Sequence, residues 1–68
     1  MKDKHGIEIQ WNDQVVVPEP NRDDSYLHSF IGNATDFDDL HNFVIVEDQD
    51  SDFYSIESHR LMVVRQQD

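Results

Sequence analysis

Three aspartates at alternating positions, Asp48, Asp50 and Asp52, are the residues whose type and spacing come closest to a chemical site. Alternating carboxylates open the calcium-binding loop of an EF-hand, where they turn inward onto the ion. That loop also requires glycine at its sixth position and glutamate at its twelfth. Here those two positions hold Phe53 and His59. We therefore expect an acidic turn with no dedicated metal site and no cofactor, and weak adventitious cation binding by the turn stays open.

Aromatic side chains provide the material for a second kind of site. Their faces attract cations, and several of them together can hold a methylated ammonium group. A small domain also needs aromatic residues to fill its core, so we assign most of them, Trp11 included, to the interior. We expect the core to need Tyr26 least, because it lies at the end of a polar loop, together with whichever of Phe53 and Tyr54 points outward.

The chain carries no recognisable catalytic motif. It contains two glycines and four histidines, which leave no glycine-rich phosphate loop and no pair of histidines at the i, i+4 spacing of a helical zinc site. No nucleophile stands in a nucleophile-elbow sequence. Pairs of carboxylates are plentiful, but a strongly acidic surface produces such pairs by chance. We expect a protein that is not an enzyme.

The net charge limits the class of partner. Fifteen acidic residues stand against five lysines and arginines, which gives a formal net charge of −10. A phosphate-binding surface needs clustered basic residues, so nucleic acid is disfavoured as a partner. The leading hypothesis is a non-catalytic interaction module whose acidic loops contact a basic peptide or a basic protein surface. Its predicted contact residues are two aromatic residues and five aspartates, namely Tyr26, Phe53, Asp23, Asp24, Asp48, Asp50 and Asp52.

Length and composition indicate one small domain. A chain of 68 residues buries only about 60% of the surface that its unfolded form exposes, and without cysteine it has no disulfide to supplement the core. We expect a single domain with a core over about residues 7–64, loose termini at 1–5 and 65–68, and a monomer or weak homodimer. The lack of cysteine and of any long apolar run favours the cytoplasm, with no membrane contact.

A β-hairpin is the clearest element of the chain, and its turn contains the alternating aspartates. Residues 43–46 and 53–56 are rich in β-branched and aromatic side chains, whereas residues 48–52 are typical of a turn. Because side chains alternate along a strand, we expect one face to be buried. That face consists of Val44, Val46, Tyr54 and Ile56. The opposite face consists of Phe43, Ile45 and Phe53. It must be covered by the segment 7–11 or by a second copy of the protein.

The remaining elements follow from periodicity and from strand-breaking residues. Residues 7–11 alternate apolar and polar and, with residues 14–17, predict one bent strand. The other expected elements, in chain order, are a strand-ending segment at 18–20, a loop at 21–25, a bent strand at 26–37, a turn at 38–41, a 3₁₀ turn at 57–60 and a strand at 61–64. Gly32 predicts a bulge or a close backbone approach. Leu61 is expected to enter the core, and Arg60 to pair with a nearby carboxylate.

This order of elements resembles an SH3-like small barrel of the KOW or Tudor kind. The resemblance implies an all-β fold, a five-stranded barrel with a single 3₁₀ turn before the last strand. In such a barrel we expect the turn that holds Asp36, Asp38 and Asp39 to lie on the same side as the long first loop.

The sequence also resembles small uncharacterised bacterial proteins. The shared segments are Val15-Val16-Val17-Pro18-Glu19-Pro20, His28-Ser29-Phe30-Ile31-Gly32, Val46 to Asp50 and Ile56 to Leu61. The match covers most of residues 14–61. It implies a fold and carries no activity.

The sequence is consistent with two alternative functions. A small acidic protein can mimic the phosphate charge of DNA and inhibit a nucleic-acid-binding protein, which requires carboxylates along one face at phosphate-like spacing. A KOW-like module associated with the ribosome or another nucleic acid would instead require a local basic cluster. The candidates for such a cluster are Arg22, Arg60 and Arg65.

Overall fold

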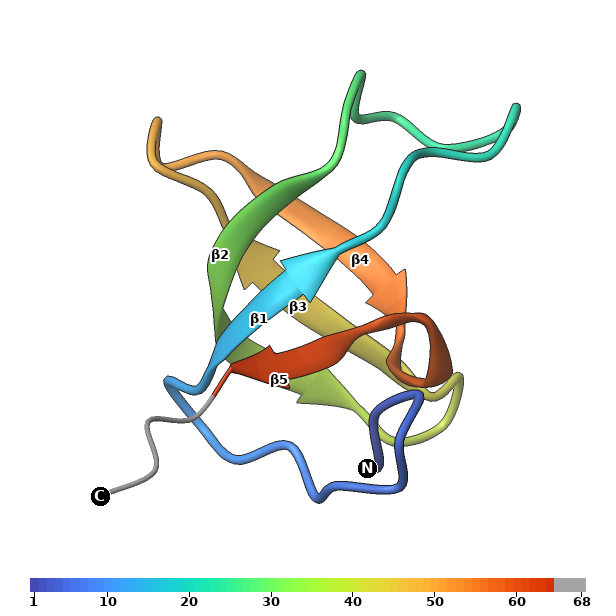
Figure 1. Cartoon of the computed structure of the whole chain (residues 1–68), viewed down its shortest axis with the longest axis vertical. Coiled ribbons are helices and arrows are strands. Elements are labelled where there is room, and N and C mark those ends of the chain that lie inside the picture. Colours follow the sequence, from blue (N-terminus) through green and yellow to red (C-terminus); the bar gives the residue numbers. More distant parts are fainter. Residues whose placement is uncertain (65–68) are drawn as a thin grey trace.

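The computed structural model describes residues 1–64, and these residues build one antiparallel β-sheet (Figure 1). Its five strands and one 3₁₀ helix are β1 (Gln14–Val17), β2 (Phe30–Asp38), β3 (Phe43–Glu47), β4 (Phe53–Glu57), η1 (Ser58–Arg60) and β5 (Met62–Val64). The strand order across the sheet is β4-β3-β2-β1-β5. The prediction of an all-β fold with five strands and a 3₁₀ turn before the last strand is confirmed. The predicted loose end at 65–68 lies outside the described residues.

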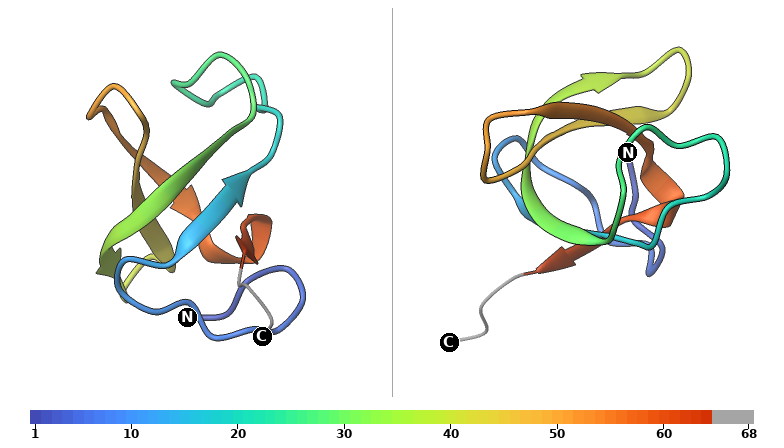
Figure 2. Two further views of the ribbon diagram at one scale, coloured as in Figure 1. Left: turned by 60° about the vertical axis from the view of Figure 1, so that its left-hand side comes forward. Right: turned by 90° about the horizontal axis from the view of Figure 1, so that it is seen from above.

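The sheet curls on itself around the core. Seen from above, its strands follow one another round a ring (Figure 2), and η1 connects the two edge strands, β4 and β5. The buried apolar side chains inside this ring form one cluster, which consists of Ile9, Val15, Val17, Tyr26, Ala34, Val44, Val46, Ile56, Leu61 and Val63. Leu61 therefore enters the core, as predicted from the sequence.

The central hairpin has the register that the sequence predicts. Val44 pairs with Ile56 and Val46 pairs with Tyr54. Val44, Val46 and Ile56 are buried, and Tyr54 is half-buried beside them. A shift of one residue would turn all of these side chains to the other face of the sheet, so burial of this face favours the observed pairing.

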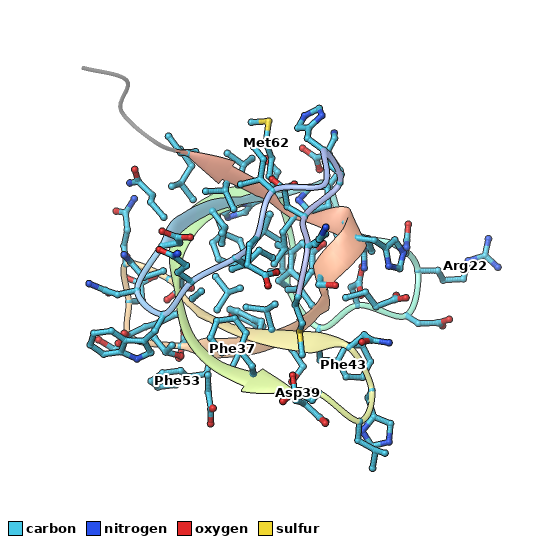
Figure 3. All side chains as sticks on the ribbon, turned by 90° about the horizontal axis from the view of Figure 1, so that it is seen from below. Arg22, Phe37, Asp39, Phe43, Phe53 and Met62 are labelled. Atoms are coloured by element: carbon cyan, nitrogen blue, oxygen red, sulfur yellow. The ribbon has the colours of Figure 1, made fainter. Side chains whose placement is uncertain are left out.

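The opposite face of the hairpin is less covered than expected. Phe53 is 59% exposed and points away from the interior (Figure 3). Phe43 and Ile45 are half-buried, and the ring of His41 stacks on Phe43 with 6.2 Å between ring centroids. Local side chains, and not a strand at residues 7–11, cover this part of the sheet.

The prediction of a strand at residues 7–11 is wrong. Ile9 is buried, but Trp11 is 73% exposed and does not belong to the core. Left-handed backbone at Gly6 (φ 79°) and Asn12 (φ 68°) turns the chain on both sides of this short segment. Of the apolar residues in this alternating segment, Ile9 alone is buried, and it anchors an extended loop. The loop forms no hydrogen-bonded ladder with the sheet.

Residues 1–5 are not loose, because the Asp3 carboxylate bonds them to the edge strand β5 of the sheet. Its Oδ1 accepts hydrogen bonds from the backbone N–H groups of His5 (2.9 Å) and Ile7 (2.8 Å). Its Oδ2 accepts a bond from the N–H of Val63 in β5 at 2.8 Å. The N–H of Lys4 donates to the carbonyl of Leu61 at 2.9 Å. The N-terminal segment therefore binds along the outer edge of β5.

The long strand β2 starts at Phe30, four residues later than its predicted beginning at Tyr26. The pairing with β3 is irregular between Ala34 and Asp36, so the bulge falls at Thr35 and not at Gly32. Gly32 is instead the site of a close approach. A Cβ atom on this glycine would collide with the carbonyl oxygen of Glu47 and lie 2.7 Å from Cγ1 of Val46.

We expect Gly32→Ala to destabilise the fold. Overpacking of a tight site typically costs about 1–3 kcal/mol, and here a backbone carbonyl that belongs to the β2–β3 ladder must move. Urea unfolding of this variant should show a lower midpoint than that of the parent protein. Ser55→Ala, at an exposed strand position, is the control, with an expected change within about 0.5 kcal/mol. Equal midpoints for the two variants would contradict the close approach.

Candidate functional site

The directions of the strands decide which loops share an end of the curled sheet. The segment 18–29 between β1 and β2 and the turn 48–52 between β3 and β4 lie at one end, whereas the turn 39–42 between β2 and β3 lies at the other (Figure 1). Successive turns of an antiparallel meander alternate between ends. The expectation that Asp36, Asp38 and Asp39 lie on the same side as the long first loop is therefore wrong. We call the end that holds segments 18–29 and 48–52 the mouth.

Three aromatic rings pack together at the mouth. The ring of Tyr26 lies 5.6 Å from that of Phe30 and 5.9 Å from that of Tyr54, both edge-on. Phe30 and Tyr54 are 5.6 Å apart and tilted by 57°. Because the rings contact one another, no space for a cation remains between them. The three rings form one wall of a pocket and not an aromatic cage.

Tyr26 is held in place by a network of polar contacts. It is only 4% exposed, so the expectation that the core needs it least is wrong. Its hydroxyl donates to the carbonyl of Pro18 at 2.9 Å and accepts a bond from Nη2 of Arg60 at 3.1 Å. Burial is the main cause that raises the pKa of Tyr26. The ring is thus a fixed part of the mouth.

Asp24 belongs to this network, because its carboxylate is paired with Arg60 of the same chain. Nη1 and Nη2 of Arg60 donate to its two carboxylate oxygens at 3.3 and 2.9 Å. The hydrogen bond from Arg60, followed by that from the backbone N–H of Asn21, lowers the pKa of Asp24. This pair confirms the prediction that Arg60 pairs with a nearby carboxylate. It links the long loop to η1 and so positions Tyr26.

The acidic turn has one carboxylate that shapes the backbone and two that project into solvent. Oδ1 of Asp48 accepts the backbone N–H groups of Asp50 and Asp52, each at 2.9 Å. Ser51 takes up the left-handed conformation that closes the turn, with φ 65°. The side chains of Asp50 and Asp52 are exposed. Carboxylate oxygens of the three aspartates lie within 4.8 Å of one another.

The acidic turn and the aromatic wall enclose a pocket of about 160 Å³. Its lining residues are Tyr26, Leu27, His28, Phe30, Asp48, Asp50, Asp52 and Tyr54. The closeness of the two parts also affects the phenol of Tyr54. Desolvation, and then the negative charges of Asp52, Asp48 and Asp50, raise the pKa of its phenol. The pocket therefore combines ring surface with strong negative potential.

The structure brings together four of the seven predicted contact residues, Tyr26, Asp48, Asp50 and Asp52. Asp24 is paired with Arg60 nearby, and Asp23 is exposed on the same loop. Phe53 lies on the outer face of the sheet and does not line the pocket.

Sequence reasoning did not select Leu27, Phe30 and Tyr54 for the site. The predicted hairpin register already turned Tyr54 inward, next to the acidic turn. This register was the sequence signal that could have identified Tyr54 as a residue of the site. Leu27 is 89% exposed at the rim of the pocket. Its apolar surface is therefore open to contact with a group bound in the pocket.

The three aspartates are also the residues of the described chain that could together hold a metal ion. Two of the three are exposed, and all three come from one turn. They would therefore contact an ion from one side only. Hard cations such as calcium need six to eight oxygen ligands. The arrangement is better suited to a ligand that brings its own apolar surface. Within residues 1–64 the structure has no helix with the length and apolarity needed to cross a bilayer.

Comparison of the chain with protein-family models, with curated proteins and with solved structures found no match.

Proposed function

We propose that this protein is a non-catalytic interaction module, an SH3-like barrel of the KOW or Tudor kind, that binds a basic segment of a partner protein at its mouth. The observation that carries the proposal is the pocket in which Asp48, Asp50 and Asp52 stand beside the rings of Phe30 and Tyr54. A cationic side chain placed there would contact carboxylates and ring surface at the same time.

The energetics favour a segment with more than one basic residue. A cation over an exposed aromatic ring gains about 0.5–1 kcal/mol, and an exposed ion pair contributes about 0.2–1 kcal/mol. Neither alone gives a useful affinity. The net charge of −10 adds long-range attraction, which accelerates encounter with a basic partner and weakens as salt is added.

The distribution of charge supports this proposal over the two nucleic-acid alternatives. A mimic of DNA needs its carboxylates along one face, but here acidic turns lie at opposite ends of the barrel. A nucleic-acid-binding module needs a basic cluster. Arg60 is paired with Asp24, Arg22 extends away from the barrel (Figure 3), and Arg65 lies outside the described residues.

The experiment measures binding of fluorescein-labelled arginine- and lysine-containing peptides by fluorescence anisotropy at low and at physiological salt. The parent protein should bind, and more weakly at the higher salt. Asp50→Asn combined with Asp52→Asn should weaken binding about three- to thirtyfold, because it removes two charges from the pocket. Their carboxylates accept no hydrogen bond from residues 1–64, so the fold should be preserved.

The matched control is Asp36→Asn combined with Asp39→Asn. It removes the same charge from the opposite end of the barrel, and asparagine keeps the oxygen with which Asp36 accepts the N–H of Phe37. This double variant should bind almost as the parent does. Equal losses in the two double variants would mean that only the overall charge matters and would reject the mouth as the site. No binding by the parent protein at either salt concentration would reject the function itself.

A further inference from the structure

We infer that the mouth is selective for an arginine of the partner that lies two positions from an apolar residue, and that it discriminates against lysine and methylated lysine. This inference rests on the proposed function and specifies the side chains that the same site recognises. Three features carry it: the closed packing of the rings, the unused carboxylate oxygens, and a second pocket that adjoins the first.

The packing of the rings excludes a caged ammonium group. A methylated ammonium is held by aromatic faces that surround it, whereas Tyr26, Phe30 and Tyr54 lie 5.6–5.9 Å apart and fill the space between themselves. Tyr26 is almost fully buried. The pocket therefore presents a wall against which a flat group can lie, and a planar guanidinium is such a group.

The carboxylates supply the partners that a guanidinium needs. Asp48 uses only Oδ1 within the turn, and the carboxylates of Asp50 and Asp52 accept no hydrogen bond from the described residues. Guanidinium has five N–H donors in a fixed plane and pairs with carboxylates in bidentate fashion. An ammonium is a compact and strongly hydrated charge with three donors. The guanidinium can satisfy several of these oxygens while its face remains on the rings.

A second pocket lies directly beside the first. It has a volume of about 180 Å³ and shares His28, Phe30, Asp48 and Asp50 with its neighbour. Its distinct apolar wall is Ile31, which is 48% exposed although it belongs to β2. The two pockets together form one groove across Phe30, with an acidic rim on the side of the turn.

The chemistry of this groove defines its occupant. The rim attracts positive charge, and the exposed side chains of Leu27 and Ile31 offer apolar contact. A basic segment without apolar residues would leave Ile31 in water. An extended peptide with an arginine two positions from a leucine can place a side chain in each pocket, since alternate residues of an extended chain point to the same side and lie about 6.6 Å apart.

The test uses isothermal titration calorimetry with peptides built on the repeat Arg-Ser-Leu. In the comparison peptides, every arginine is replaced by lysine or by trimethyl-lysine, or every leucine is replaced by serine. The arginine peptide should bind about three- to tenfold more tightly than the lysine peptide, a preference that reflects bidentate pairing and ring contact. Trimethyl-lysine, which has no N–H donor, should bind more weakly still.

The variant Ile31→Ser tests the second pocket. It should weaken binding of the Arg-Ser-Leu peptide about threefold or more and leave binding of the Arg-Ser-Ser peptide unchanged, because only the first peptide brings a side chain to that wall. Thermal melting followed by circular dichroism checks that this exposed position tolerates the change. A variant whose melting is altered is replaced by Ile31→Thr, which keeps the β-branched shape.

The outcomes separate this inference from the proposed function. Equal affinity for arginine and lysine peptides, with binding still lost in the Asp50 and Asp52 double variant, would overturn the selectivity and leave the function intact. Tightest binding of the trimethyl-lysine peptide would likewise overturn it, since the site would then act as a cage. An Ile31→Ser variant that binds both arginine peptides as the parent does would remove the second pocket. No binding of any peptide would reject the inference together with the function.

Discussion

Replacement of Leu61 by alanine is expected to lower the free energy of unfolding by about 2–5 kcal/mol, the typical cost of truncating a buried leucine. Leu61 is fully buried between η1 and β5, and it contributes to the one core cluster of the domain. At roughly 0.05–0.15 kcal/mol per residue, a domain of 68 residues has about 3–10 kcal/mol of total stability. The substitution should therefore remove a large share of it.

Urea unfolding followed by tryptophan fluorescence measures this loss, and circular dichroism gives a second probe because Trp11 is exposed. Leu40→Ala is the matched control. Leu40 is 83% exposed in the turn between β2 and β3, so its truncation should change the stability by less than about 0.5 kcal/mol. Similar losses in the two variants would show that Leu61 is not part of the core.

The second large effect is expected at Asp3, where alanine would leave three backbone N–H groups without their acceptor. A hydrogen bond to a charged group contributes about 1.5–3 kcal/mol, and the bond to Val63 is buried. We expect Asp3→Ala to lose at least that amount at pH 7. Asp3→Asn keeps one acceptor oxygen and should lose less. Asp23→Ala, at an exposed loop position, should be neutral within about 0.5 kcal/mol.

The effect of Asp3 depends on pH in a defined direction. Burial by itself would raise the pKa of this carboxyl, but the bonds from Val63, Ile7 and His5 outweigh it and lower the pKa below the ordinary 3.8. A carboxyl with a lowered pKa in the folded state stabilises the fold above its unfolded-state pKa. The contribution disappears as the pH falls through the lower folded value.

Urea unfolding of the parent and of Asp3→Ala at pH 7, 4 and 3 measures this dependence. The difference between the two proteins should be largest at pH 7 and should shrink as the pH is lowered toward and below about 3.8. A difference that stays constant over this range would show that the Asp3 carboxylate does not hold the N-terminal segment.

Half of the candidate site could be predicted from the sequence. The acidic turn is local, because Asp48 bonds to backbone groups two and four residues ahead. The inward direction of Tyr54 follows from the alternation of its own strand. Phe30 and Leu27 could not be selected in this way. Their closeness to the turn depends on where the loop 18–29 folds back, which no local pattern encodes.

The sequence by itself determined the elements whose cause is local or periodic. The register of the hairpin follows from the alternation of Val44, Val46 and Ile56, and the burial of Leu61 follows from its place after a short turn. Period two and turn chemistry act over a few residues, so they can be recognised without the rest of the chain.

The tertiary structure alone decided whether Trp11, Tyr26 and Asp3 are exposed or buried. Trp11 stays exposed because the chain turns at Asn12 before a strand can form, and Tyr26 is buried because Arg60, more than thirty residues away, holds its hydroxyl. Asp3 becomes a structural residue through Val63, which is 60 positions distant. The outcomes for Tyr26 and Asp3 depend on bonds between segments far apart in sequence. Such bonds leave no periodic pattern in the sequence. They can form only after the sheet has folded and brought the two segments together.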